Sequence, residues 1–148
     1  MGVTAVLRLA VVRGSPRKPG NSDYLTDLFL DGMRALTPGG LELREFRPSA
    51  MRITPCQGCG GCDRTGECII RDDMDQIYGA VRWANGIAVS SPVFFASMPA
   101  QAKAMVDRFQ CAWVAKYRLG IPWVDASEGR RLALLTVGAM RVTRFHEQ

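Results

Sequence analysis

The 148-residue chain is long enough for one domain with a buried core, and its composition, 47% hydrophobic and 22% charged, is that of a globular protein. The formal net charge of +5 is spread along the chain without a run of basic residues. This pattern argues against a nucleic-acid partner and suits an anionic small molecule such as a phosphorylated cofactor.

The first residues, MGVTAVLRLAVV, are apolar but too short to cross a bilayer, and Arg8 interrupts them. No small-residue cleavage site follows, so the segment is not interpreted as a secretory signal. Five cysteines, an odd number, fit a reducing compartment in which thiols stay free or bind metal. We therefore expect a cytoplasmic protein that makes no membrane contact.

Strand-like and helix-like segments alternate along the sequence. An almost continuous apolar run over residues 3–12 predicts a strand covered on both faces. Apolar residues at three- and four-residue spacing then predict a helix, with Asn21 or Ser22 as N-cap and Pro38 beyond its end. The later predicted elements are a strand over Leu41–Phe46, a helix opened by Asp72 and Asp73, a strand over 86–95, a helix over 98–109, a less regular segment over 111–129 and a strand over 130–138.

This alternation predicts one domain over residues 1–148, a doubly wound α/β fold in three layers, with helices on both faces of a parallel sheet. In such sheets a ligand lies at the carboxyl ends of the strands. Two of the predicted loops occupy that edge.

The first of these loops, GSPRKPGNS, joins the first strand to the first helix. Ser15 and Ser22 supply hydroxyl groups, Arg17 supplies a cation, and the helix start supplies amides, which together are the donors that hold a phosphate. An ordinary turn with a helix cap fits the composition of this loop equally well.

The second loop, SSPVFFASMPAQ, leaves the third predicted strand. Its aromatic pair, Phe94 and Phe95, suits either core packing or a wall against a flat heterocycle. In the second case Ser91, Ala96 and Ser97 offer polar partners.

Four cysteines lie in one glycine-rich stretch, spaced Cys56-x2-Cys59-x2-Cys62-x5-Cys68. Structural zinc sites separate their two Cys-x2-Cys pairs by a dozen or more residues, whereas successive x2 spacings are typical of ferredoxin-like cluster loops. A 4Fe–4S cluster, free thiols without metal, a zinc site and a redox disulfide all remain open. The fifth cysteine, Cys111, is expected to be a small core residue.

Three motifs in this order, GSPRKPGNS, PCQGCGGCDRTGECIIRDDM and SPVFFASMPAQAKAMVDR, resemble the NADPH-dependent FMN reductases of the flavodoxin-like superfamily. More narrowly, they resemble its iron–sulfur flavoprotein branch. The resemblance implies non-covalently bound FMN that carries the chemistry without a catalytic side chain, and NAD(P)H as co-substrate. The sequence departs from the family pattern at Phe94, where a tyrosine is more usual.

The resemblance also implies residue roles. The FMN phosphate would be held by Ser15, Arg17, Asn21 and Ser22. The ring would lie against Pro92, Val93, Phe94, Phe95, Ala96 and Ser97, with Gly138 bordering its far side. A 4Fe–4S cluster would be bound by Cys56, Cys59, Cys62 and Cys68, close to FMN across a subunit contact.

Flavodoxin-like sheets have five strands, whereas the sequence predicts four, so the last strand and helix are expected to be lacking. An unpaired edge strand favours association, and we expect a homodimer or homotetramer. The expected electron acceptor is a small molecule or an electron carrier protein. The alternative function is a non-catalytic flavin- or cysteine-based redox sensor or electron carrier.

Overall fold

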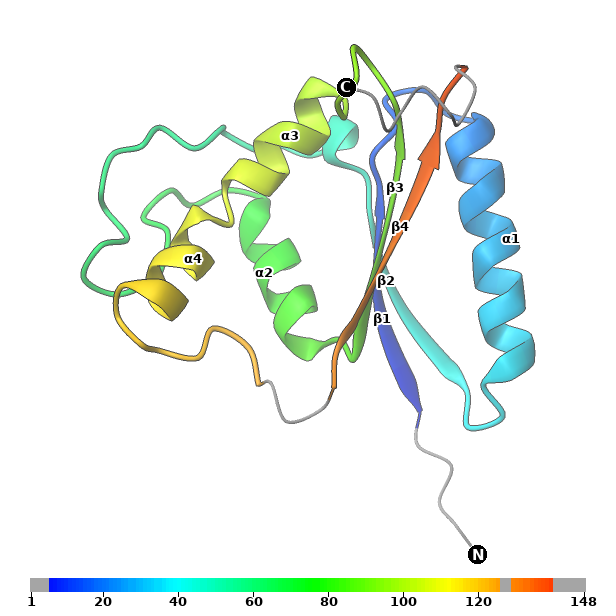
Figure 1. Ribbon diagram of the computed structural model, residues 1–148, viewed down its shortest axis with the longest axis horizontal. Coiled ribbons are helices and arrows are strands. Elements are labelled where there is room, and N and C mark those ends of the chain that lie inside the picture. Colours follow the sequence, from blue (N-terminus) through cyan, green and yellow to red (C-terminus); the bar gives the residue numbers. More distant parts are fainter. Residues whose placement is uncertain (1–5, 126–128, 140–148) are drawn as a thin grey trace, which may run out of the picture.

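The computed structural model describes residues 6–125 and 129–139. Its strands form one parallel sheet in the order β2-β1-β3-β4. Helix α1 covers one face, and α2, α3 and α4 lie on the other, which confirms the predicted three layers (Figure 1). The elements are β1 (Leu7–Arg13), α1 (Asn21–Leu36), β2 (Leu41–Phe46), the 3-10 helix η1 (Pro48–Ala50), α2 (Met74–Trp83), β3 (Gly86–Pro92), α3 (Ala100–Asp107), α4 (Gln110–Tyr117) and β4 (Arg131–Val137).

Strand β1 lies in the middle of the sheet, which explains its nearly unbroken apolar sequence. Val11 pairs in register with Glu45 of β2 and with Ala88 of β3, and it is fully buried. The carboxyl ends of the strands all point to one edge, where α1 begins and where β3 passes into α3 (Figure 1). No helix in the described part of the chain is long and apolar enough to cross a membrane.

Two apolar cores flank the sheet. On the α1 face, Leu30 packs with Leu9, Val11 and Ala88. On the opposite face the buried cluster combines β1 with α2, α3 and α4, and its members are Val12, Met74, Ile77, Tyr78, Val81, Met105 and Cys111. Burial of side chains of this size contributes about 1.5–3 kcal/mol each, so both helical layers are held to the sheet by apolar packing.

Two local predictions were wrong. Helix α1 is capped by Gly20, so that Asn21 and Ser22 lie inside its first turn. Residues 110–117 form helix α4, within a segment predicted to be less regular. The helix is only two turns long, and its buried positions Cys111, Val114 and Ala115 give too short a pattern to separate from a loop.

Strand β4 is at the edge of the described sheet. Leu132 and Leu134 pair with Ile87 and Val89 of β3, yet their side chains are 69% and 61% exposed. An apolar groove of about 430 Å³ runs beside this strand, between the sheet and α2 and α3. The homodimer or homotetramer expected from the sequence stays a prediction.

The packing of α1 can be tested with two leucines on the same helix. We expect Leu30→Ala to lower the free energy of unfolding by about 2–5 kcal/mol, because it opens a cavity at a side chain that is 1% exposed. Leu36→Ala, at a side chain that is 79% exposed, should change it by less than about 0.5 kcal/mol. Urea denaturation measures both, and equal losses would contradict the described placement of α1.

Candidate functional site

The loop between β1 and α1 is held in shape by Ser15. Its buried hydroxyl accepts a hydrogen bond from the Arg17 amide at 3.2 Å and donates one to the Arg17 carbonyl oxygen at 3.2 Å. The loop ends at Gly20, directly before the first turn of α1. The helix N-terminus therefore opens onto this loop, where its amides favour an anion. Of the predicted phosphate ligands, Ser15 and Ser22 are buried, and Arg17 and Asn21 are exposed.

Arg47, which no sequence motif singled out, supports this loop from the end of β2. Its Nη1 donates to the Ser15 carbonyl oxygen at 2.8 Å, and its Nη2 bonds Asp23 Oδ1 at 2.5 Å. Arg13 lies 3.6 Å from the same carboxylate oxygen. Arg47 is thus the main cation partner of Asp23 at the start of α1, because Arg13 pairs more closely with Asp27 and Glu45. The available signal was a cation directly after a strand at the ligand edge.

The aromatic loop is a tight turn after β3. The Phe94 amide donates to the Ser97 carbonyl oxygen at 2.8 Å, and the Ser97 amide returns a bond to Phe94 at 2.9 Å. Between them, Phe95 and Ala96 have positive φ angles of 48° and 59°. Such angles suit glycine, and side chains that adopt them are strained, a feature that clusters at binding sites. Phe95 is fully exposed at the tip, so the aromatic pair is not core packing there.

The two loops meet at one edge of the sheet. The Gly14 amide donates to the Ser90 carbonyl oxygen at 2.7 Å, and a Cβ on Gly14 would lie 2.6 Å from that oxygen. The Val93 amide bonds the Val137 carbonyl oxygen at 2.9 Å, directly before the exposed Gly138. The predicted flavin-binding segments after β1, β3 and β4 are therefore brought to the same edge, as parallel strands require (Figure 1).

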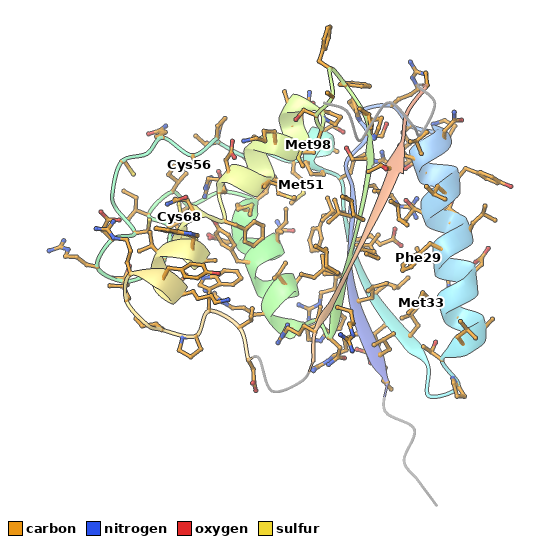
Figure 2. All side chains as sticks on the ribbon, viewed as in Figure 1. Phe29, Met33, Met51, Cys56, Cys68 and Met98 are labelled. Atoms are coloured by element: carbon orange, nitrogen blue, oxygen red, sulfur yellow. The ribbon has the colours of Figure 1, made fainter. Side chains whose placement is uncertain are left out.

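The cysteine stretch forms a long loop on the α2–α4 side, away from the sheet (Figure 2). Cys56 and Cys59 are exposed, whereas Cys62 and Cys68 are partly buried. All four line one open cavity of about 740 Å³, and buried Cys111 of α4 lines it as well. The expectation of a core position for Cys111 is confirmed, but its contact with this cavity was not predicted.

The donor set and the loop backbone fit a metal–sulfur group. Gly58 and Gly60 have positive φ angles of 62° and 69°, which let the chain curl around a ligand. Within the described ranges, no three His, Cys, Asp or Glu side chains are grouped closely enough to hold a metal ion. Binding therefore requires the loop to draw its thiols together. Burial raises the pKa of the Cys62 thiol, so metal binding must also displace its proton.

Both ends of the cysteine loop are fastened by Arg108, which follows α3 and is 1% exposed. Its Nη1 donates to the Thr54 carbonyl oxygen and to Asp72 Oδ2, each at 2.7 Å, and its Nη2 donates to the Ile70 carbonyl oxygen at 3.0 Å. Asp72 in turn accepts bonds from the amides of Thr54 at 2.8 Å and Met74 at 3.0 Å. The interpretation of Asp72 as a helix-start charge was incomplete, because this carboxylate also closes the loop.

The ion pair between Asp72 and Arg108 strengthens the attachment of the loop ends. Burial alone would raise the pKa of Asp72, but the hydrogen bond from Arg108 and the two amides outweigh it, so that the pKa lies below its ordinary value. Burial would lower the pKa of Arg108, and the bond to Asp72 reverses this direction. Both groups are therefore charged at neutral pH.

The core beneath the cavity is aromatic. Tyr78 donates to the Arg108 carbonyl oxygen at 2.6 Å, and its ring meets Phe109 and Trp123 edge to face. Burial raises the pKa of Tyr78, so it stays a neutral donor. These contacts fix the α3–α4 junction, and with it one wall of the cysteine cavity.

Comparison with known proteins shows the family. The family model for NADPH-dependent FMN reductase matches residues 7–143. The chain belongs to the NADPH-dependent FMN reductase family. FMN is thus the cofactor that family membership indicates. The predicted family and fold are confirmed.

Curated relatives of this FMN reductase family member are named iron–sulfur flavoproteins. One from Archaeoglobus fulgidus is 37% identical over 97 residues, which cover 66% of this chain and 43% of the relative. One from Methanosarcina thermophila is 36% identical over 102 residues, which cover 69% of this chain and 52% of the relative. The chain therefore spans about half the length of these relatives.

A solved structure shows the same flavodoxin-like fold. An azoreductase from Bacillus anthracis str. Sterne aligns with a TM-score of 0.70 and 16% identity, over 93% of this chain and 71% of its own. At this identity the likeness supports the architecture of the FMN reductase family member rather than a substrate.

Because the aromatic loop is strained, glycine substitutions at Ala96 in this loop and at Ala104 in α3 should change the free energy of unfolding in opposite directions. Ala96→Gly should raise the free energy of unfolding by about 0.5–1 kcal/mol, because it removes a side chain from a positive-φ position. Ala104→Gly, inside α3, should lower it by about 1 kcal/mol. Chemical denaturation distinguishes the two, and destabilisation by Ala96→Gly would show that the turn is not strained.

The fastening of the cysteine loop predicts a pH dependence. Because the folded-state pKa of Asp72 is depressed, its stabilisation is complete above its unfolded pKa of about 3.9 and is lost as pH falls through the lower folded value. Asp72→Asn should cost about 2–3 kcal/mol at pH 7 and reduce the loss of stability on acidification.

Asp75→Asn is the matched control. Its carboxylate is 44% exposed in an ion pair with Arg71, so the change should cost less than about 1 kcal/mol. Urea unfolding from pH 3 to 7 measures both variants. If the free energy of unfolding of wild type and of Asp72→Asn changes with pH in parallel, the stabilising role of the Asp72–Arg108 ion pair is refuted.

Proposed function

We propose that this chain forms the FMN-binding part of an NAD(P)H-linked oxidoreductase that carries a 4Fe–4S cluster on its cysteine loop. The observation that supports this most strongly is the meeting of the phosphate loop, the aromatic loop and the end of β4 at one sheet edge. Membership in the FMN reductase family names the cofactor that such an edge would bind.

The residues at this edge would bind and orient the flavin. The amides at the start of α1, with Ser15, Arg17, Asn21 and Ser22, would hold the phosphate. The turn at Phe94–Ser97 would lie against the ring, and Gly138 would border its other side. FMN, when bound, supplies the hydride and electron chemistry, so that no side chain need act as a nucleophile or general base.

The cluster would be held by Cys56, Cys59, Cys62 and Cys68. Three observations support this: the successive x2 spacings, the single cavity that all four thiols line, and the names of the curated relatives. The cluster, when bound, exchanges single electrons. The electron acceptor would be a small molecule or a carrier protein, and exposed Phe95 is an apolar contact point for it.

An absorption spectrum of anaerobically purified protein, with iron and acid-labile sulfide assayed on the same sample, tests the cofactors. We expect flavin bands over a broad shoulder and about four irons per chain. Cys59→Ser should lose the iron and keep the flavin. Cys111→Ala, the control, should keep both, because Cys111 is a buried core residue of α4, outside the stretch from Cys56 to Cys68.

Each other outcome has a distinct meaning. Flavin without iron would leave an FMN reductase with free thiols, and protein without flavin after reconstitution with FMN would contradict the proposal. Steady oxidation of NADH or NADPH with an added quinone would argue against a non-catalytic sensor. Bound flavin that NAD(P)H never reduces would favour the sensor.

A further inference from the structure

Arg108 is the buried cation in the wall of the cysteine cavity. The described residues of that wall include the loop thiols together with Arg108, Phe109 and Cys111 at the α3–α4 junction. The two Nη atoms of Arg108 are bound to the loop ends, but its buried Nε has no hydrogen-bond partner. A buried donor without a partner is costly, and it normally indicates an absent ligand or water.

The charges around Arg108 also indicate an anionic ligand in the cavity. Its one carboxylate partner among the described residues is Asp72, and that carboxylate is shared with the backbone amides of Thr54 and Met74. The other cation lining the cavity, Arg118, is 53% exposed and paired with Asp63. A thiolate-ligated cluster is anionic, and a fixed guanidinium at its edge would offset that charge where water screens it little.

We propose that Arg108 is the positioning residue of the metal site: it holds both ends of the cysteine loop and presents a buried positive charge and a free Nε–H to the sulfur atoms of the cluster. This inference rests on the cluster of the proposed function. Hydrogen bonds and charge near cluster sulfurs are among the factors that set reduction potential. Arg108 therefore has two separable effects, one on the loop and one on the potential.

The first effect can be measured without metal. In the apo-protein, Arg108→Gln and Arg108→Lys should both speed alkylation of partly buried Cys68 by iodoacetamide about tenfold, because neither side chain reaches all three acceptors. Peptide mapping by mass spectrometry assigns the rate to Cys68. The matched control is Arg71→Gln, which removes a 70% exposed arginine at the same end of the loop and should leave the rate unchanged.

The second effect is measured after anaerobic reconstitution with iron and sulfide. A dithionite titration followed by electron paramagnetic resonance gives the potential of the cluster. Arg108→Gln should shift it by about 59 mV to more negative values, a tenfold change in the one-electron equilibrium. Arg108→Lys keeps the charge and should stay near the wild-type potential.

The outcomes separate the two claims. Wild-type labelling rates in both Arg108 variants would overturn the positioning role, and an unchanged potential in iron-replete Arg108→Gln would overturn the electrostatic role. Equal effects in Arg71→Gln would overturn both, because bulk charge would then suffice. If Arg108→Gln does not fold, fast labelling at wild-type potential in Arg108→Lys supports the inference, and slow labelling overturns it. Wild-type protein that binds no iron refutes the proposed cluster, while labelling still decides the loop-positioning claim.

Discussion

One buried guanidinium ties the cysteine loop to the rest of the molecule. Residues 52–73 contain no helix or strand, and most of their side chains are exposed, so apolar packing holds them weakly. Arg108 joins the two ends of this segment to the end of α3, and Asp72 completes the connection. A buried ion pair of this kind adds little net stability compared with an apolar pair of similar size. Its value here lies in specificity, because it defines where the loop leaves and rejoins the fold.

The same helix connects both candidate sites. α3 begins just after the aromatic loop and ends beside Arg108, and its eight residues span about 12 Å. The direction of parallel strands fixes its start at the ligand edge, and the aromatic contacts of Tyr78 and Phe109 fix its end. The geometry of one short helix thus sets the position of the candidate flavin site relative to the cysteine cavity within this chain.

Strong periodicity made the layers and the four strands predictable from sequence, and strand-end chemistry made the loops predictable. Helix α4 was not predicted, because two turns with outward-facing Trp113 and Tyr117 carry no clear amphipathic signal. The roles of Arg47 and Arg108 were not predicted for a different reason. Their partners Ser15 and Thr54 are 32 and 54 residues away, and only the folded chain brings them together. The positive φ angles of Phe95 and Ala96 were equally hidden, since neither residue is glycine.

We propose that one chain binds a flavin at the sheet edge and a cluster on the cysteine loop. The most direct measurement is a crystal structure of anaerobically purified protein, with data collected at the iron absorption edge. We expect flavin density between the loops after β1 and β3, and an anomalous peak next to Arg108 that is surrounded by Cys56, Cys59, Cys62 and Cys68. Iron bound elsewhere, or flavin bound away from that edge, would contradict it.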